Sequence, residues 1–219
     1  ALPICRWMQH FGFVWRRPGP IVGPTDPFYD EKMRKIRKLL RGLPANEIAV
    51  FQDEVDINLT PKIGSQWMPR GLQAEVETPG NNRKLYLSGS LAWTTGTLLV
   101  SEPQTRRNSD LFLDHLDDLR RRLRGCTRIH VICENASFHK SRDVREYLDG
   151  WGHQIWLHFL PAYSPETNPI ERVWWHLHEA ITRNHRCKTI DELASIAGKW
   201  LATNNNFYAD MRNTFALAA

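Results

Sequence analysis

The sequence predicts an α/β protein in which a mixed sheet carries helices on its faces. Three observations lead to this fold class. Residues 47–100 show mainly strand patterns, residues 109–159 alternate between helix and strand patterns, and residues beyond 168 show helix patterns alone. Strands followed by alternating helices and strands favour a sheet with both antiparallel and parallel neighbours. At 219 residues the chain can bury one good core.

The first part of the chain predicts the end of a preceding unit and a linker. Residues 4–11 have the pattern of a short helix, and Pro18-Gly19-Pro20 cannot continue it. Proline recurs at positions 24 and 27, and residues 29–40 then form an amphipathic helix rich in Lys and Arg. We therefore expect two parts, residues 1–24 and residues 25–219.

The strand patterns begin at residue 47. Residues 48–51 form a short apolar run that fits a buried strand, with Asp53 and Glu54 at its end. Apolar and polar residues then alternate within residues 66–100, most clearly at 85–91 and 97–100. Turn signals at Pro79-Gly80 and Thr95-Gly96 predict hairpins in this stretch.

The remaining elements follow from changes in periodicity. Residues 109–123 have apolar positions at helical spacing. The expected elements after them are strands at 128–133 and 155–159 and helices at 142–148, 169–184 and 191–204.

The charge of the chain favours a polyanionic partner without requiring one. The formal net charge is +5 and the pI is about 9.2. Each basic cluster alone fits a solvated helix face, whereas all of them beside a carboxylate site favour contact with a phosphate backbone. The clusters lie at 16–17, 32–41, 106–107, 120–124 and 183–188. No apolar run approaches the roughly 18 residues of a membrane span, so we expect a cytosolic protein without membrane partners.

Three acidic positions from distant parts of the chain suggest a divalent-metal site. Asp53 and Glu134 follow predicted central strands, and they meet if those strands are neighbours. Either acid alone could instead form a turn or simply end a strand. Because side chains alternate along a strand, at most one of Asp53 and Glu54 is expected to join the site. Two ions held by carboxylates can activate a nucleophile and stabilise the leaving oxygen of a phosphodiester.

The third acid, Glu171, has a competing explanation. Asn168-Pro169-Ile170-Glu171 is also a helix-start pattern, with Asn168 as the N-cap and Glu171 as a capping-box residue. Both roles would hold Glu171 near the edge of the sheet.

Three tracts resemble the signature blocks of insertion-sequence transposases of the mariner superfamily. They are FQDE at 51–54, VICENASFHKS at 131–141 and LPAYSPETNPIERVWW at 160–175, and the resemblance extends over about residues 45–215. It implies an RNase H-like catalytic domain with a five-stranded mixed sheet. It also implies an Asp-Asp-Glu triad matched by Asp53, Glu134 and Glu171, which would hold Mg²⁺ or Mn²⁺, in all two ions.

The resemblance further implies partners and a location. Residues 1–24 would be the remnant of an N-terminal DNA-binding domain and its linker. Transposon ends and target DNA would be the substrates of a homodimeric full-length protein in the bacterial cytosol, associated with the nucleoid. We expect DNA contacts from a set of basic residues: Arg16, Arg17, Lys62, Arg70, His139 and Lys140. A hairpin packed by Trp67 is the alternative for the segment of Lys62 and Arg70, and a structural hydrogen bond is the alternative for His139.

One residue departs from the family pattern. The family has Asp where this chain has Glu134. The extra methylene moves the carboxylate by about one C–C bond, whereas catalytic geometry tolerates about 0.5 Å. The sequence therefore predicts a transposase catalytic domain, and it leaves two rivals: a DNA-binding protein of the same fold with impaired catalysis, and an RNase H-like nuclease acting on another nucleic acid. A plain α/β domain whose acids are caps and turns would have to match all three tracts by chance.

Overall fold

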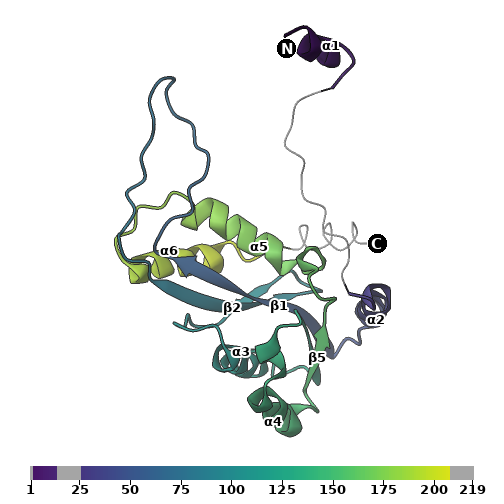
Figure 1. Cartoon of the computed structure of the whole chain (residues 1–219). Coiled ribbons are helices and arrows are strands. Elements are labelled where there is room, and N and C mark those ends of the chain that lie inside the picture. The colour runs from purple at the N-terminus through teal and green to yellow at the C-terminus, as the bar shows by residue number, and fades with distance from the viewer. Residues whose placement is uncertain (1, 14–25, 208–219) are drawn as a thin grey trace.

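The computed structural model describes residues 2–13 and 26–207, and a five-stranded mixed sheet lies at its centre (Figure 1). The strand order is β3-β2-β1-β4-β5. β1 pairs antiparallel with β2 and β2 with β3, whereas β1–β4 and β4–β5 are parallel. The sheet agrees with the predicted mixed topology. The strands are β1 (Glu47–Asn58), β2 (Lys84–Ala92), β3 (Leu98–Val100), β4 (Arg128–Cys133) and β5 (Ile155–Phe159).

Helices cover both faces of the sheet, as the sequence predicted. In Figure 1, α5 and α6 lie above the sheet and α3 and α4 lie below it. Two apolar clusters fill the spaces between the layers, one containing residues of α2, α5 and α6 and the other residues of α3 and α4. The helices are α1 (Leu2–His10), α2 (Tyr29–Arg41), α3 (Ser109–Arg122), α4 (Arg142–Trp151), α5 (Ile170–Leu177) and α6 (Ile190–Thr203), with short turns η1 (Ser137–Lys140), η2 (Pro165–Thr167) and η3 (His178–Thr182).

Strand β1 supplies side chains to both layers because successive residues point to opposite faces. Phe51 and Val55 belong to the cluster with α5, and Val50 belongs to the cluster with α3. By the same alternation Asp53 lies on the α5 face and Glu54 on the α3 face. The buried apolar residues on both sides of β1 explain its nearly continuous apolar sequence.

Part of the predicted antiparallel region is wrong. Residues 59–83 form no strand and instead make a long loop that projects from the sheet between β1 and β2 (Figure 1). Trp67 in this loop is fully exposed, so no hairpin is packed by it. Alternation of apolar and polar residues indicates a strand only where a neighbouring strand supplies hydrogen bonds. Here the pairing with β1 begins at Lys84.

The N-terminal prediction is only partly covered by the structure. Helix α2 confirms the predicted amphipathic helix, which packs against the core through Met33, Ile36 and Leu40. The boundary at residues 24–25 lies outside the described residues, as do Arg16 and Arg17. Among the residues that are described, no helix is long and apolar enough to cross a membrane.

Candidate active site

Asp53 and Glu134 meet because their strands are parallel neighbours. The β1–β4 register pairs Phe51 with Ile132, so two residues further along each strand Asp53 comes opposite Glu134. Each of the two carboxylates offers an oxygen within 4.8 Å of the other. Asp53 is buried, whereas the side chain of Glu134, just beyond the last residue of β4, is 46% exposed. This confirms the prediction that the two acids come together.

Glu171 reaches the same place from the first turn of α5. It lines one cleft together with Asp53 and Glu134, and the cleft has a volume of about 500 Å³. The predicted capping box is wrong, because α5 begins at Ile170 and has no side-chain cap. The side chain of Asn168 instead donates from Nδ2 to the carbonyl oxygen of Gln52, 3.1 Å away. Asn168 therefore ties the start of α5 to β1 instead of capping the helix.

The cleft concentrates negative charge around one buried carboxylate, that of Asp53. Burial raises the pKa of Asp53 well above its usual range, and the nearby Glu171, Glu54 and Glu134 carboxylates raise it further. Burial and Glu134 likewise raise the pKa of Glu171. A cation between these groups would remove the repulsion that raises both pKa values.

The donors of the cleft suit a hard divalent cation. Carboxylate and amide oxygens are the ligands that Mg²⁺ and Mn²⁺ prefer. Asn135 and Asn168 also line the cleft, and among the described residues the Oδ1 atom of each is buried without a hydrogen-bond partner. Buried polar atoms normally have a partner, so two unpaired oxygens beside three acids fit a site that takes a cation and its water.

A tryptophan holds one oxygen of the first acid. Trp174 of α5 donates from Nε1 to Oδ2 of Asp53 at 3.1 Å. Gly89 on β2 pairs with Asp53 and leaves room for the indole, since a Cβ there would lie 2.6 Å from Cη2 of Trp174. The indole of Trp174 can therefore reach Asp53 only because residue 89 of β2 is a glycine.

Replacing Gly89 by Ala is expected to displace Trp174 from Asp53. The overpacking should lower the free energy of unfolding by about 1–3 kcal/mol, measured by urea denaturation. Gly198→Ala is the control, because no atom lies within 4 Å of the added methyl group in α6. That variant should gain up to about 1 kcal/mol from helix propensity. Equal stability of Gly89→Ala and the parent chain would contradict the close packing.

Glu54 lies near the acids although strand alternation puts its side chain on the opposite face of β1 from Asp53. One of its oxygens is within 4.8 Å of ligand atoms of both Asp53 and Glu134, but Glu54 does not line the cleft. That at most one of Asp53 and Glu54 joins the site stays a prediction. Burial raises the pKa of Glu54, but hydrogen bonds from His139 and Gln52 and the charge of Arg107 outweigh this effect and lower it. The sequence marked Arg107 only as part of the basic cluster at 106–107, and it gave no sign that this residue bonds Glu134, 27 residues further along the chain.

The basic residues predicted to contact DNA separate into two groups. His139 is buried, and its ring bonds the main-chain oxygen of Glu134 and the carboxylate of Glu54, so its structural alternative fits and a DNA contact does not. Three other predicted contacts are exposed: Lys62, Arg70 and Lys140.

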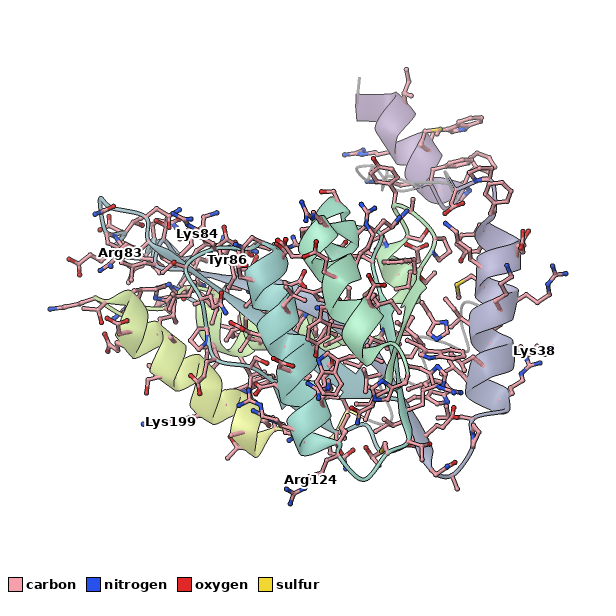
Figure 2. The ribbon with its side chains drawn as sticks, turned by 90° about the horizontal axis from the view of Figure 1, so that it is seen from below. Lys38, Arg83, Lys84, Tyr86, Arg124 and Lys199 are labelled. Carbon is pink, nitrogen blue, oxygen red and sulfur yellow. The ribbon has the colours of Figure 1, made fainter. Side chains whose placement is uncertain are left out.

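The basic clusters at 32–41 and 120–124 do not share one face. Lys38 and Arg124 project from different sides of the molecule (Figure 2).

Comparisons with known proteins identify the family of this chain. The family model described as DDE superfamily endonuclease matches residues 49–194. The chain is 38% identical over 202 residues to the uncharacterised 39 kDa protein of insertion element IS630 from Shigella sonnei, covering 92% of this chain and 58% of that protein. The chain thus spans a little over half the length of this curated relative.

Solved structures of Mos1 transposase have the same fold. The mariner Mos1 paired-end complex with Mg matches with a TM-score of 0.70 and 16% identity, over 98% of this chain and 67% of that one. The paired-end complex with Mn matches with a TM-score of 0.71 and 16% identity, over 98% and 68% of the two chains. The likeness confirms the predicted RNase H-like fold. Because the family model covers most of the sheet and all three acids of the cleft, the chain belongs to the DDE superfamily endonucleases.

Proposed function

We propose that this chain is the catalytic part of a DNA transposase that cuts DNA at transposon ends and joins the freed 3′ end to target DNA. One observation carries the proposal: Asp53, Glu134 and Glu171 come from three separate segments and line one cleft in a DDE superfamily endonuclease. The relative from an insertion element and the Mos1 paired-end complexes support the choice of transposition over other phosphodiester chemistry.

The three acids are proposed to hold two divalent ions, Mg²⁺ or Mn²⁺. Both metals are named for the Mos1 complexes. Such ions supply a water or hydroxyl nucleophile at neutral pH and stabilise the leaving oxygen. The protein contributes the geometry: the β1–β4 register brings two acids together, α5 brings the third, and Trp174 orients Asp53.

DNA at the transposon ends and at the target is the proposed partner. Lys62 and Arg70 in the projecting loop, with Lys140 on η1, are exposed cations suited to phosphate contacts, and Arg16 and Arg17 remain candidates. We further propose that residues 1–24 belong to a DNA-binding region and its linker. The full-length protein is proposed to act as a homodimer on DNA in the bacterial cytosol, at the nucleoid.

A cleavage assay tests the proposed function. The chain is expected to nick supercoiled plasmid, and to cut duplexes that carry insertion-element ends, when Mg²⁺ or Mn²⁺ is present and not in EDTA. Glu171→Gln keeps the size of the side chain and removes its charge, so it should lower nicking by about 100-fold or more, since even changes around a metal ligand cost 10–100-fold. Nicking that persists in EDTA or in this variant would contradict the metal mechanism. Single-stranded RNA and RNA–DNA hybrid in the same assay test the nuclease alternative.

One observation favours a second candidate, a DNA-binding protein with impaired catalysis. Glu134 replaces the Asp of the family pattern, and its Oε1 is 2.5 Å from Nη2 of Arg107. A carboxylate held by a guanidinium at this distance has one oxygen fewer to offer a metal. This candidate predicts salt-sensitive binding to DNA without cleavage in either metal, whereas the transposase predicts both.

A further inference from the structure

The residue at position 134 is held from two directions by one cluster on the α3 face of the sheet. His139 bonds the main-chain oxygen of Glu134 through Nδ1 at 3.0 Å. Arg107 bonds its carboxylate through Nη2 at 2.5 Å. Both of these residues also bond Glu54, at 3.2 Å from Nε2 of His139 and 3.2 Å from Nη2 of Arg107. We call Glu54, Arg107 and His139 the support cluster.

Both oxygens of Glu54 are already engaged by protein donors. A carboxylate offers about four lone-pair positions. Its Oε1 accepts from Gln52 Nε2 at 2.6 Å and from His139. Its Oε2 accepts from Nε of Arg107 at 3.3 Å and faces Nη2 of the same guanidinium. The side chains of Glu54 and His139 are both 0% exposed, so water cannot replace any partner that an ion would displace.

From this geometry we propose that Glu54 is a positioning residue for the second acid of the site and not a ligand. The inference rests on the proposed function, because it assigns a role within the same metal site. Glu54 anchors Arg107 and His139, and these two set the side chain and the main chain of residue 134. Position 134 needs such support because β4 ends at Cys133 and the Glu134 side chain is 46% exposed. Groups that orient a metal ligand typically contribute 10–100-fold to metal affinity.

Titration of Mn²⁺ into the chain by calorimetry tests the inference. Glu54→Gln keeps the shape but replaces one acceptor by a donor, so the dissociation constant should rise by about 10-fold or more while the number of ions per chain stays the same. Arg107→Lys keeps the positive charge but cannot bond Glu54 and Glu134 through a guanidinium, so it should also raise the dissociation constant for Mn²⁺. Because Glu54 and Arg107 act as one unit, the variant that carries both Glu54→Gln and Arg107→Lys should lose less Mn²⁺ affinity than the sum of the two single losses. In cleavage assays kcat should fall while KM for DNA is unchanged.

The chain contains a matched control at the other end of the same two strands. Glu47 of β1 bonds Arg128 at 3.1 Å and His130 at 2.7 Å, which repeats the carboxylate, guanidinium and imidazole of the support cluster away from the cleft. Glu47→Gln should lower the urea midpoint without changing Mn²⁺ affinity. A purely structural role of Glu54 predicts that Glu54→Gln behaves in the same way.

The outcomes separate the inference from the proposed function. If Glu54→Gln loses a bound ion while Arg107→Lys binds Mn²⁺ normally, Glu54 is a ligand and the inference is wrong. Unchanged affinity in both variants also overturns it. If Glu54→Gln does not fold, Arg107→Lys still decides, because Arg107 is 38% exposed and tolerates the exchange more readily. A parent chain that binds no Mn²⁺ contradicts the proposed function itself, and the inference with it.

Discussion

Replacing Glu134 by Asp is expected to raise the rate of metal-dependent DNA cleavage by about 100-fold. The shorter side chain withdraws the carboxylate by roughly 1.5 Å, the length of one C–C bond, and a misplacement of about 1 Å in a catalytic site can cost 100-fold. The withdrawn carboxylate returns to the position that the family pattern has at this site. The rate is measured on end-DNA duplexes at saturating Mg²⁺ and Mn²⁺.

Glu171→Asp is the matched control, since it makes the same shortening at the other glutamate of the cleft. The family pattern has Glu at this position, so this variant should lose activity while Glu134→Asp gains it. Opposite effects of the two variants on the cleavage rate would show that activity depends on the position of each carboxylate, and not on a general preference for a shorter acid. If Glu134→Asp cleaves no faster than the parent chain, the departure at position 134 does not limit catalysis.

Replacing Asp53 by Asn is expected to abolish cleavage and at the same time to stabilise the protein without metal. Asp53 is one of the three acids that line the cleft. Losing its carboxylate should lower the cleavage rate by more than the roughly 100-fold seen for groups that only orient metal ligands. The gain in stability has a different cause. Asn is uncharged, keeps an oxygen for Nε1 of Trp174, and removes a buried charge from beside Glu54, Glu134 and Glu171.

The pH dependence of stability should change in the same variant. Because the pKa of Asp53 is raised in the folded protein, the folded state binds more protons than the unfolded state between the usual pKa of 3.8 and the raised value. The Asp53 contribution to the free energy of unfolding is therefore greatest at low pH and falls as pH rises through that window. Asp53→Asn should remove this fall in urea denaturation measured over pH 4 to 8 in EDTA.

Added Mg²⁺ should show the converse effect. An ion that binds only the folded state stabilises it, so the melting temperature of the parent chain should rise with Mg²⁺ concentration while that of Asp53→Asn should not. A variant that still cleaves DNA, or that is less stable than the parent chain in EDTA, would contradict the assignment of Asp53 as a metal ligand.

Much of the sheet was predictable because its signals are local. The apolar run before Asp53 predicts a strand buried on both faces, and it forms the first part of β1. The alternation over residues 85–91 predicts β2, which is confirmed. The loop at residues 59–83 was not predictable, because its alternating residues resemble a strand and only the absence of a pairing partner shows otherwise.

The candidate site was predicted in part for a similar reason. The resemblance to a family indicated the positions of Asp53, Glu134 and Glu171. The strand-end argument is right for Glu134, which directly follows β4, and wrong for Asp53, because β1 continues past it to Asn58. Asn168 looked like an N-cap because the local pattern is the same, but a hydrogen bond to the carbonyl of Gln52, 116 residues earlier, takes its side chain. A contact between segments so far apart leaves no trace in the local sequence.

The sequence by itself determined the fold class, the family and the three acidic positions, because periodicity and motif spacing are properties of neighbouring residues. Only the tertiary structure decided how these positions work together. The register of β1 against β4 places Asp53 opposite Glu134, and Gly89 on β2 admits Trp174 to Asp53. Three hydrogen bonds and an ion pair engage the carboxylate of Glu54, which lies within reach of the acids. These facts depend on distances between residues far apart in the chain, and packing alone sets such distances.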